Sequence, residues 1–216
     1  MKIGKIDQQT HGFTLFEGVI VVFVLALVVA ALIPALNSAR HKAKFINCSG
    51  QLAEIGIAFR VWEGDHHDQY PMAVSVTNGG AMELLATGNV AACFQVMSNE
   101  LSVPEILFCP GDTRHQAAAN FAGLSGSNVS YFIGLDVTES DPQAVLSGDA
   151  NLAQNGRAIA GGVLTLGTNL TTWTQERHGG AASVLFCDGS VEQLRQIGFT
   201  NEFGWMVRPT NRVVVP

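Results

Sequence analysis

Charged residues are scarce in this chain of 216 residues, and the scarcity is uneven. Only 14% of the residues are Asp, Glu, Lys or Arg, whereas an ordinary globular protein has about 25%. Between Asp7 and Arg40 the one charged side chain is that of Glu17, with His11 taken as neutral. A single apolar segment therefore skews the composition, and the remainder is long enough for one domain with its own core.

Clusters of basic residues are lacking after Lys44, and 18 acidic residues outnumber 12 basic ones. Nucleic-acid binding needs a positively charged face, so we expect no nucleic-acid partner. The 23 glycines predict a loop-rich, partly β domain after the first helix.

No Cys-x-x-Cys pair occurs, which argues against a zinc ribbon or a thioredoxin-like redox site. The four cysteines are Cys48, Cys93, Cys109 and Cys187. Export of the domain would favour disulfides, and four cysteines allow three complete pairings. The alternative is four buried thiols that pack as small hydrophobic residues.

One long apolar run is present. Residues 19–36 contain no charged or strongly polar side chain, and with residues 13–18 the candidate helix has 24 residues. At about 1.5 Å per residue such a helix spans a hydrocarbon core of roughly 30 Å. We therefore predict a transmembrane helix over 13–36. A secretory signal peptide is the alternative, but the run is too long and lacks a clean cleavage boundary.

Glu17 is the informative residue of this segment. An ionised carboxylate in a bilayer costs several kcal/mol unless it is paired, so it usually has a partner or a function. The simpler alternative is that Glu17 lies at the membrane interface and is hydrated.

The sequence Gly-Phe-Thr-Leu-Phe-Glu at 12–17, followed by the apolar helix, resembles the processing signal of type IV prepilins and type II secretion pseudopilins. The resemblance implies a leader of residues 1–12, cleavage between Gly12 and Phe13 by a prepilin peptidase, and N-methylation of Phe13. Glu17 is the fifth residue after the cut, as in that family.

The resemblance also implies an assembly role for Glu17, which pairs in such filaments with the N-terminal amine of a neighbouring subunit. Pro34 lies where many pilins have a helix-kinking proline. The expected partners are the prepilin peptidase, other pilin or pseudopilin subunits and the inner membrane. The expected location is the inner membrane, with a single span and the C-terminal domain outside the cytoplasm, followed by assembly into a periplasmic or cell-surface filament.

The helix is expected to continue as an amphipathic segment over 37–64. Leu52, Ile55, Phe59 and Trp62 have the spacing of one helical face. Residues 65–216 then form the globular domain. Its clearest feature is Asp188-Gly189, a strong hairpin signal between strands over 183–187 and 191–195.

Weaker patterns complete the predicted domain. Strands are expected over 128–134 and 158–166, and either short helices or irregular structure over 81–87 and 91–100. The prediction is an α+β fold, pilin-like, with a long N-terminal helix packed on a small antiparallel sheet.

A second resemblance lies in the C-terminal part. His178, nine residues and then Asp188-Gly189 match a signature of the prepilin-like proteins abundant in Planctomycetes, Verrucomicrobia and their relatives. Further fragments of the same pattern are Phe108–Asp112, Ser130-Tyr131 and Gly148-Asp149.

Metal binding has weak candidates only, and no other cofactor is expected. Asp149 and Asp188 could serve a structural calcium ion, which prefers oxygen ligands. The alternative is that Asp188 shapes its turn and His178 hydrogen-bonds to backbone. We interpret His66-His67 as a solvated turn rather than a metal site, because adjacent side chains point apart. Cys109 is a candidate for pairing with Cys93 or Cys48.

The favoured function is a structural filament subunit without catalytic activity. The first alternative is a membrane-anchored binding domain that uses the prepilin export route without polymerising. The second is an exported enzyme with His178 and Asp188 at its active site. No clear nucleophile accompanies these two residues in the sequence.

Overall fold

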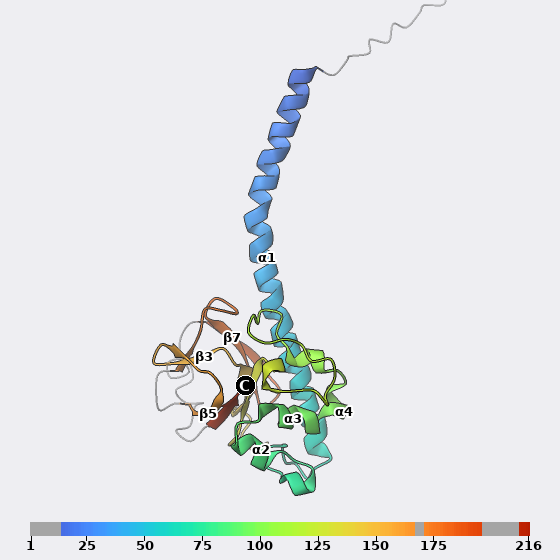
Figure 1. The fold of residues 1–216 in the computed structure, drawn as a ribbon, viewed down its shortest axis with the longest axis vertical. Helices are drawn as coiled ribbons and strands as arrows, with labels where there is room; N and C mark the ends of the chain where they lie inside the picture. The colour runs from blue at the N-terminus through green and yellow to red at the C-terminus, as the bar shows by residue number, and fades with distance from the viewer. Residues whose placement is uncertain (1–13, 167–170, 196–211) are drawn as a thin grey trace, which may run out of the picture. The chain divides into compact units, whose positions relative to one another are not determined.

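The structure is a computed structural model that describes residues 14–166, 171–195 and 212–216. The described residues form one long helix, short helical segments and two antiparallel sheets (Figure 1). The predicted α+β fold is confirmed. The chain divides into two compact units, residues 1–40 and 41–216.

Helix α1 runs from Leu15 to Gly64 and passes through Pro34 without ending. Its most apolar 18-residue window has a mean hydropathy of 3.2 and no buried residue. By length and composition this helix is able to cross a membrane, as the sequence predicts. The kink expected at Pro34 stays a prediction.

The C-terminal part of α1 belongs to the second unit and buries the face predicted from its spacing. The side chains of Leu52, Ile55, Phe59 and Trp62 are at most 2% exposed. Their 3-4-3 spacing places them on one side of a helix with 3.6 residues per turn. The face predicted from the spacing is therefore the buried one.

The helix ends in a tight turn. His67 and Asp68 both have a φ angle of 58°, a left-handed conformation that cannot extend a right-handed helix. The ring of His66 stacks on Trp62 with a centroid distance of 3.6 Å.

The larger sheet has six strands in the order β5-β9-β1-β2-β7-β8. Every neighbouring pair for which a register is defined is antiparallel. The strands are β1 Tyr131–Gly134, β2 Val145–Asp149, β5 Gly162–Thr165, β7 Ala181–Phe186, β8 Val191–Arg195 and β9 Arg212–Val215.

The predicted hairpin is confirmed as β7 and β8, in which Leu185 pairs with Val191. Gly189 occupies the turn with a φ angle of 85°, which glycine adopts without steric cost. The Asp188 carboxylate accepts hydrogen bonds from the Ser190 backbone N–H and hydroxyl at 2.8 and 2.6 Å. Asp188 thus shapes the turn, as one of the two sequence interpretations expected.

Successive side chains of the central strands enter two separate cores, because residues of a strand alternate between its faces. Tyr131 and Ile133 join the core that includes the buried face of α1, whereas Phe132 joins the second core. In β7, Val184 and Phe186 belong to the second core and Leu185 to the first. Both faces of the sheet are therefore covered.

Short helices contribute to the first core. They are α2 Met82–Ala86, α3 Val90–Val96 and α4 Ser98–Leu101, with 3-10 turns η1 Val76–Asn78, η2 Pro104–Leu107 and η3 Gly126–Asn128. These elements agree with short helices, one of the two alternatives expected over 81–87 and 91–100.

The smaller sheet has the order β4-β3-β6. Its strands are β3 Leu152–Gln154, β4 Arg157–Ala158 and β6 Thr171–Trp173. The single strand predicted over 158–166 is wrong, because Gly161 and Gly162, at φ angles of 109° and 98°, turn the chain from β4 in the smaller sheet to β5 in the larger one. The strand predicted over 128–134 begins later, at Tyr131.

Candidate functional site

The first candidate site is the beginning of α1. The Thr14 backbone N–H and hydroxyl both donate to Glu17 Oε2, at 2.8 and 2.7 Å. The Glu17 N–H donates in return to the Thr14 hydroxyl at 3.3 Å. This is a reciprocal capping box, which provides acceptors for backbone N–H groups at the helix start that have no partner within the helix. Gly12 and Phe13 lie outside the described residues, so the cleavage prediction remains a prediction.

Exposed apolar side chains follow Glu17 along the helix. Among the described residues of the first unit nothing covers them, and most are about half exposed or more. Such a continuous apolar surface indicates a hydrocarbon or protein partner rather than water. Its large side chains are Leu15, Phe16, Val19, Ile20, Val21, Val22, Phe23, Val24, Leu25, Leu27, Val28, Val29, Leu32, Ile33 and Leu36.

The second candidate site surrounds a disulfide. Cys48 on α1 and Cys109 in the loop after η2 are joined, with Cα atoms 5.3 Å apart. This selects one of the two pairings considered for Cys109. Cys93 and Cys187 are free and buried. Burial raises the pKa of Cys93 well above its usual value and that of Cys187 to about 12, so both thiols stay protonated.

His178 and Asp149 lie beside this disulfide. His178 Nε2 is 3.4 Å from Cys109 Sγ and 3.8 Å from Asp149 Oδ2. Both side chains are at most 1% exposed, and Phe45 covers the imidazole with a ring-centroid distance of 4.7 Å. Burial and then the nearby Arg177 charge lower the pKa of His178 to about 4, so the imidazole is neutral near pH 7.

The expected backbone hydrogen bond of His178 is wrong. Its Nε2 faces sulfur, and its Nδ1 is buried without a hydrogen-bond partner in the part of the chain that the structure describes. The loop before β7 turns sharply at Gly179 and Gly180, whose φ angles are 65° and 81°. This turn holds the imidazole against the loop that contains Cys109: a Cβ added at Gly111 would lie 2.8 Å from His178 Cε1.

Arg177 is the centre of a buried charge network. Its side chain is 1% exposed. Its Nη2 lies 2.5 Å from Asp112 Oδ2, and its Nη1 donates to the Ser130 carbonyl and lies 3.9 Å from Asp149 Oδ1. Asp112 also accepts hydrogen bonds from Ser130 Oγ at 2.7 Å and His115 Nδ1 at 2.7 Å. A buried guanidinium keeps its charge and needs such partners.

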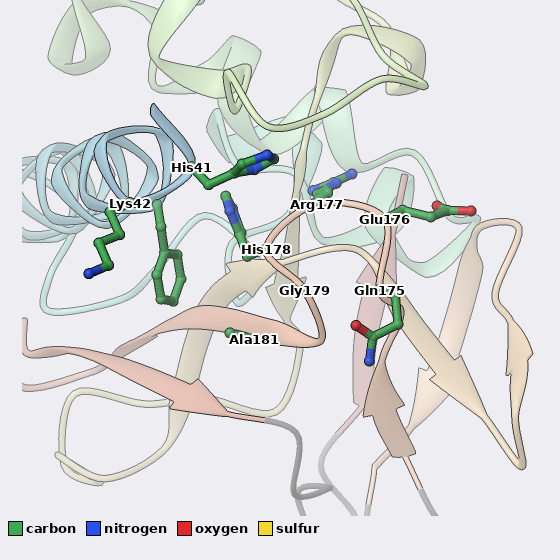
Figure 2. A pocket seen from close by; sticks show the side chains of 9 residues that line it. His41, Lys42, Gln175, Glu176, Arg177, His178, Gly179 and Ala181 are labelled. Atoms are coloured by element: carbon green, nitrogen blue, oxygen red, sulfur yellow. The ribbon is translucent and has the colours of Figure 1, made fainter. Parts of the chain in front are cut away.

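A shallow pocket of about 520 Å³ adjoins the cluster. Figure 2 shows His178 pointing from the loop before β7 toward α1, which bears His41 and Lys42. Gln175 and Glu176 belong to the loop side of the pocket. The pocket therefore leads from the surface to the imidazole beside the disulfide.

The two calcium candidates have different surroundings. Asp149 is fully buried in β2, where its Oδ2 accepts a hydrogen bond from the Ser183 N–H at 2.7 Å. Asp188 is exposed in the β7–β8 turn. The calcium prediction stays untested, and the two acids serve different parts of the fold.

Sequence reasoning overlooked the roles of Arg177 and Asp112, although Asp112 belongs to a fragment that carries the second resemblance and Arg177 directly precedes His178 of another. The structure brings those fragments together: the loop of Cys109 and Asp112, Ser130 before β1, Asp149 at the end of β2, and Arg177-His178 before β7. The resemblance shared by these fragments was the signal available in the sequence. Their polar residues are far apart along the chain but form one buried cluster in the fold.

Comparison with known proteins adds no assignment. The chain matches no protein-family model, and neither the curated proteins nor the solved structures contain a significant match to it.

Proposed function

We propose that this protein is a membrane-anchored subunit of a type IV pilus-like or type II secretion pseudopilus filament. A peptidase cuts the precursor between Gly12 and Phe13 and methylates the new amine. The observation that supports this most is Glu17, the lone charged side chain in the first part of a long helix whose residues 19–36 are apolar and exposed.

The apolar helix supplies both anchoring and assembly. Full burial of one Val, Leu, Ile or Phe side chain contributes about 1.5–3 kcal/mol, and this helix presents many. In the precursor the lipid core covers them. In a filament the same surfaces pack against equivalent helices of other subunits.

Glu17 supplies the register between subunits. Among the described residues, the hydrogen bonds to the Glu17 carboxylate use Oε2 alone, which leaves Oε1 for a neighbour's N-terminal amine. An unpaired carboxylate is costly in an apolar surrounding. Subunits therefore associate best in the register that brings an amine to each Glu17.

The first test is the mature N-terminus. We expect that the chain, co-expressed with an active prepilin peptidase, loses its first 12 residues and gains one methyl group. N-terminal sequencing and intact mass measure this. Gly12→Val should block the cut. Gly18→Ala is the matched control, because no atom lies within 4 Å of the added Cβ. A wild-type chain that still begins at Met1 would contradict the proposal.

The second arm measures assembly in cells with the filament machinery. Glu17→Gln should be cut normally but reduce the filament yield by at least about tenfold, because it loses the ionic pair. Glu54→Gln changes an exposed acid of the same helix and should assemble normally. A wild-type chain that is cut and anchored yet never cross-links to itself or to other pilin-like subunits would favour the non-polymerising binding domain.

A further inference from the structure

Four metal-binding side chains converge at the disulfide. Cys48 and Cys109 Sγ, His178 and one carboxylate oxygen of Asp149 each offer a ligand atom, and these atoms all lie within 4.8 Å of one another. They come from α1, the loop after η2, the loop before β7 and strand β2. The set lies outside the apolar N-terminal segment and takes no ligand from it.

The chemistry of the set favours a tetrahedral transition-metal ion. Thiolate, imidazole and carboxylate are the ligands that Zn²⁺ takes, usually four at a time. Calcium would need six to eight oxygen ligands, which this cluster does not offer.

We propose that, once the Cys48–Cys109 disulfide is reduced, Cys48, Cys109, His178 and Asp149 bind one Zn²⁺ ion. A dithiol supplies the two electrons that break the sulfur–sulfur bond and becomes a disulfide itself. The two protein thiols then release their protons as both thiolates bind the ion. The sulfurs move apart in this step, since each lies about 2.3 Å from the metal rather than bonded to the other.

The surroundings of Asp149 fit a metal ligand. Its Oδ2 is fixed by the Ser183 N–H, whereas its Oδ1 is buried and has no hydrogen-bond partner among the described residues. Burying a carboxylate oxygen without a hydrogen bond is costly. Coordination of a cation by Asp149 would offset that cost.

Arg177 places a positive charge beside the proposed centre. Two thiolates and a carboxylate exceed the charge of a divalent ion by one negative charge. The buried Arg177 guanidinium, with Nη1 3.9 Å from Asp149 Oδ1, offsets part of this excess and also pairs with Asp112. Such charged neighbours outside the ligand set position and tune a metal centre.

The pocket described above reaches the centre at one ligand. His178 lines this pocket together with Phe45 and Lys42, whereas Cys48, Cys109 and Asp149 do not. The imidazole therefore separates the pocket from the disulfide, and a small dithiol or an ion that enters on this side must pass it. The same side chains thus form either a covalent tie or a metal centre, and the oxidation state of the cysteines selects between them.

The test uses the full chain in detergent micelles, freed of metal and kept without oxygen. It is titrated with Co²⁺, either oxidised or after reduction by a phosphine. We expect the reduced chain to bind one Co²⁺ per chain, with thiolate-to-cobalt charge-transfer and tetrahedral ligand-field absorption, and Zn²⁺ to displace it. The oxidised chain should give no such absorption. Failure of the reduced wild-type chain to bind would overturn the proposal without any variant.

Variants then assign the ligands. His178→Ala and Asp149→Asn should each weaken binding by at least about tenfold. His41→Ala removes a second imidazole that lines the pocket, and Cys93→Ser removes a buried thiol outside the cluster; both should retain the wild-type affinity. Circular dichroism checks that each variant is folded. Binding that survives His178→Ala but disappears in Cys93→Ser would also overturn the assignment.

Discussion

At the scale of single residues, two carboxylates beside the same buried cation have pKa values shifted in opposite directions. Burial opposes ionisation of Asp112, but hydrogen bonds from His115 and Ser130 and the close Arg177 charge outweigh it and lower the pKa. Asp149 is also buried, and its weaker contacts with Ser183 and Arg177 leave its pKa raised to about 6. Among the described residues, Asp149 is completely buried and accepts one hydrogen bond, whereas Asp112 accepts several and also lies closer to Arg177, at 2.5 Å against 3.9 Å.

Asp112 should therefore govern part of the acid stability. The pKa of Asp112 in the folded state is below the ordinary value of 3.8. The stability that its ionised carboxylate contributes is therefore complete above pH 3.8 and is lost as the pH falls below that value. Asp112→Asn should lower the free energy of unfolding by about 3–5 kcal/mol near pH 7, since it leaves Arg177 without its closest anionic partner. Below pH 3.8 the loss of stability should be less steep than in the wild-type chain. Denaturant titrations followed by tryptophan fluorescence measure both effects.

The matched control is Asp136→Asn, which removes a surface pair. Asp136 binds Arg212, whose side chain is 55% exposed. Surface pairs contribute about 1 kcal/mol or less. An equal decrease in the free energy of unfolding of the two variants would show that the buried network stabilises the fold no more than a surface ion pair does.

At the scale of elements, α1 contains two glycines with contrasting surroundings. Gly50 is exposed, and no atom lies within 4 Å of an added Cβ. Gly56 is buried against β7, and an added Cβ would lie 2.9 Å from Leu185 Cδ1. Close packing of helix on sheet thus requires glycine at one position only.

We predict opposite effects of alanine at these two positions. Gly50→Ala should raise the free energy of unfolding by about 0.5–1 kcal/mol, because alanine is the better helix former. Gly56→Ala should lower it by about 1–3 kcal/mol, because Leu185 is fully buried and cannot move freely. Thermal unfolding of the two variants provides the comparison. Equal stabilisation by both would mean that α1 and β7 are not in contact as described.

At the scale of the whole molecule, the disulfide ties α1 to the loop before β1 across 61 residues of chain. The same region of α1 contacts the sheet through Ser49 Oγ and Ser183 Oγ, 2.8 Å apart. Arg60 Nη2 also donates to the Cys187 carbonyl at 2.6 Å. These two hydrogen bonds join segments that lie far apart in the sequence of the second unit.

Reduction should therefore destabilise the second unit measurably. Closing a loop of this length contributes about 4 kcal/mol in the chain-entropy account. Denaturant titration of the full chain in a metal chelator, with and without a phosphine, should show a loss of this order. The double variant Cys48→Ala/Cys109→Ala should not respond to the reductant. An equal response of that variant would trace the effect to another part of the protein.

The sequence by itself determined the features that depend on local pattern. The apolar length of the first helix, the lone Glu17, the buried face at Leu52, Ile55 and Phe59, and the Asp188-Gly189 hairpin all follow from helical periodicity and turn chemistry. The break at Gly161-Gly162 escaped prediction, because an apolar run does not reveal which of two sheets each half will join.

Only the tertiary structure decided which distant side chains meet. The lack of a Cys-x-x-Cys pair argued against a zinc ribbon, and no local pattern brought Cys48 and Cys109 together with His178 and Asp149. Their distances depend on the packing of α1 against the sheet and on the loop before β7, which no local pattern specifies. Arg177 acquired its role for the same reason, since burial beside Asp112 is a property of the folded chain.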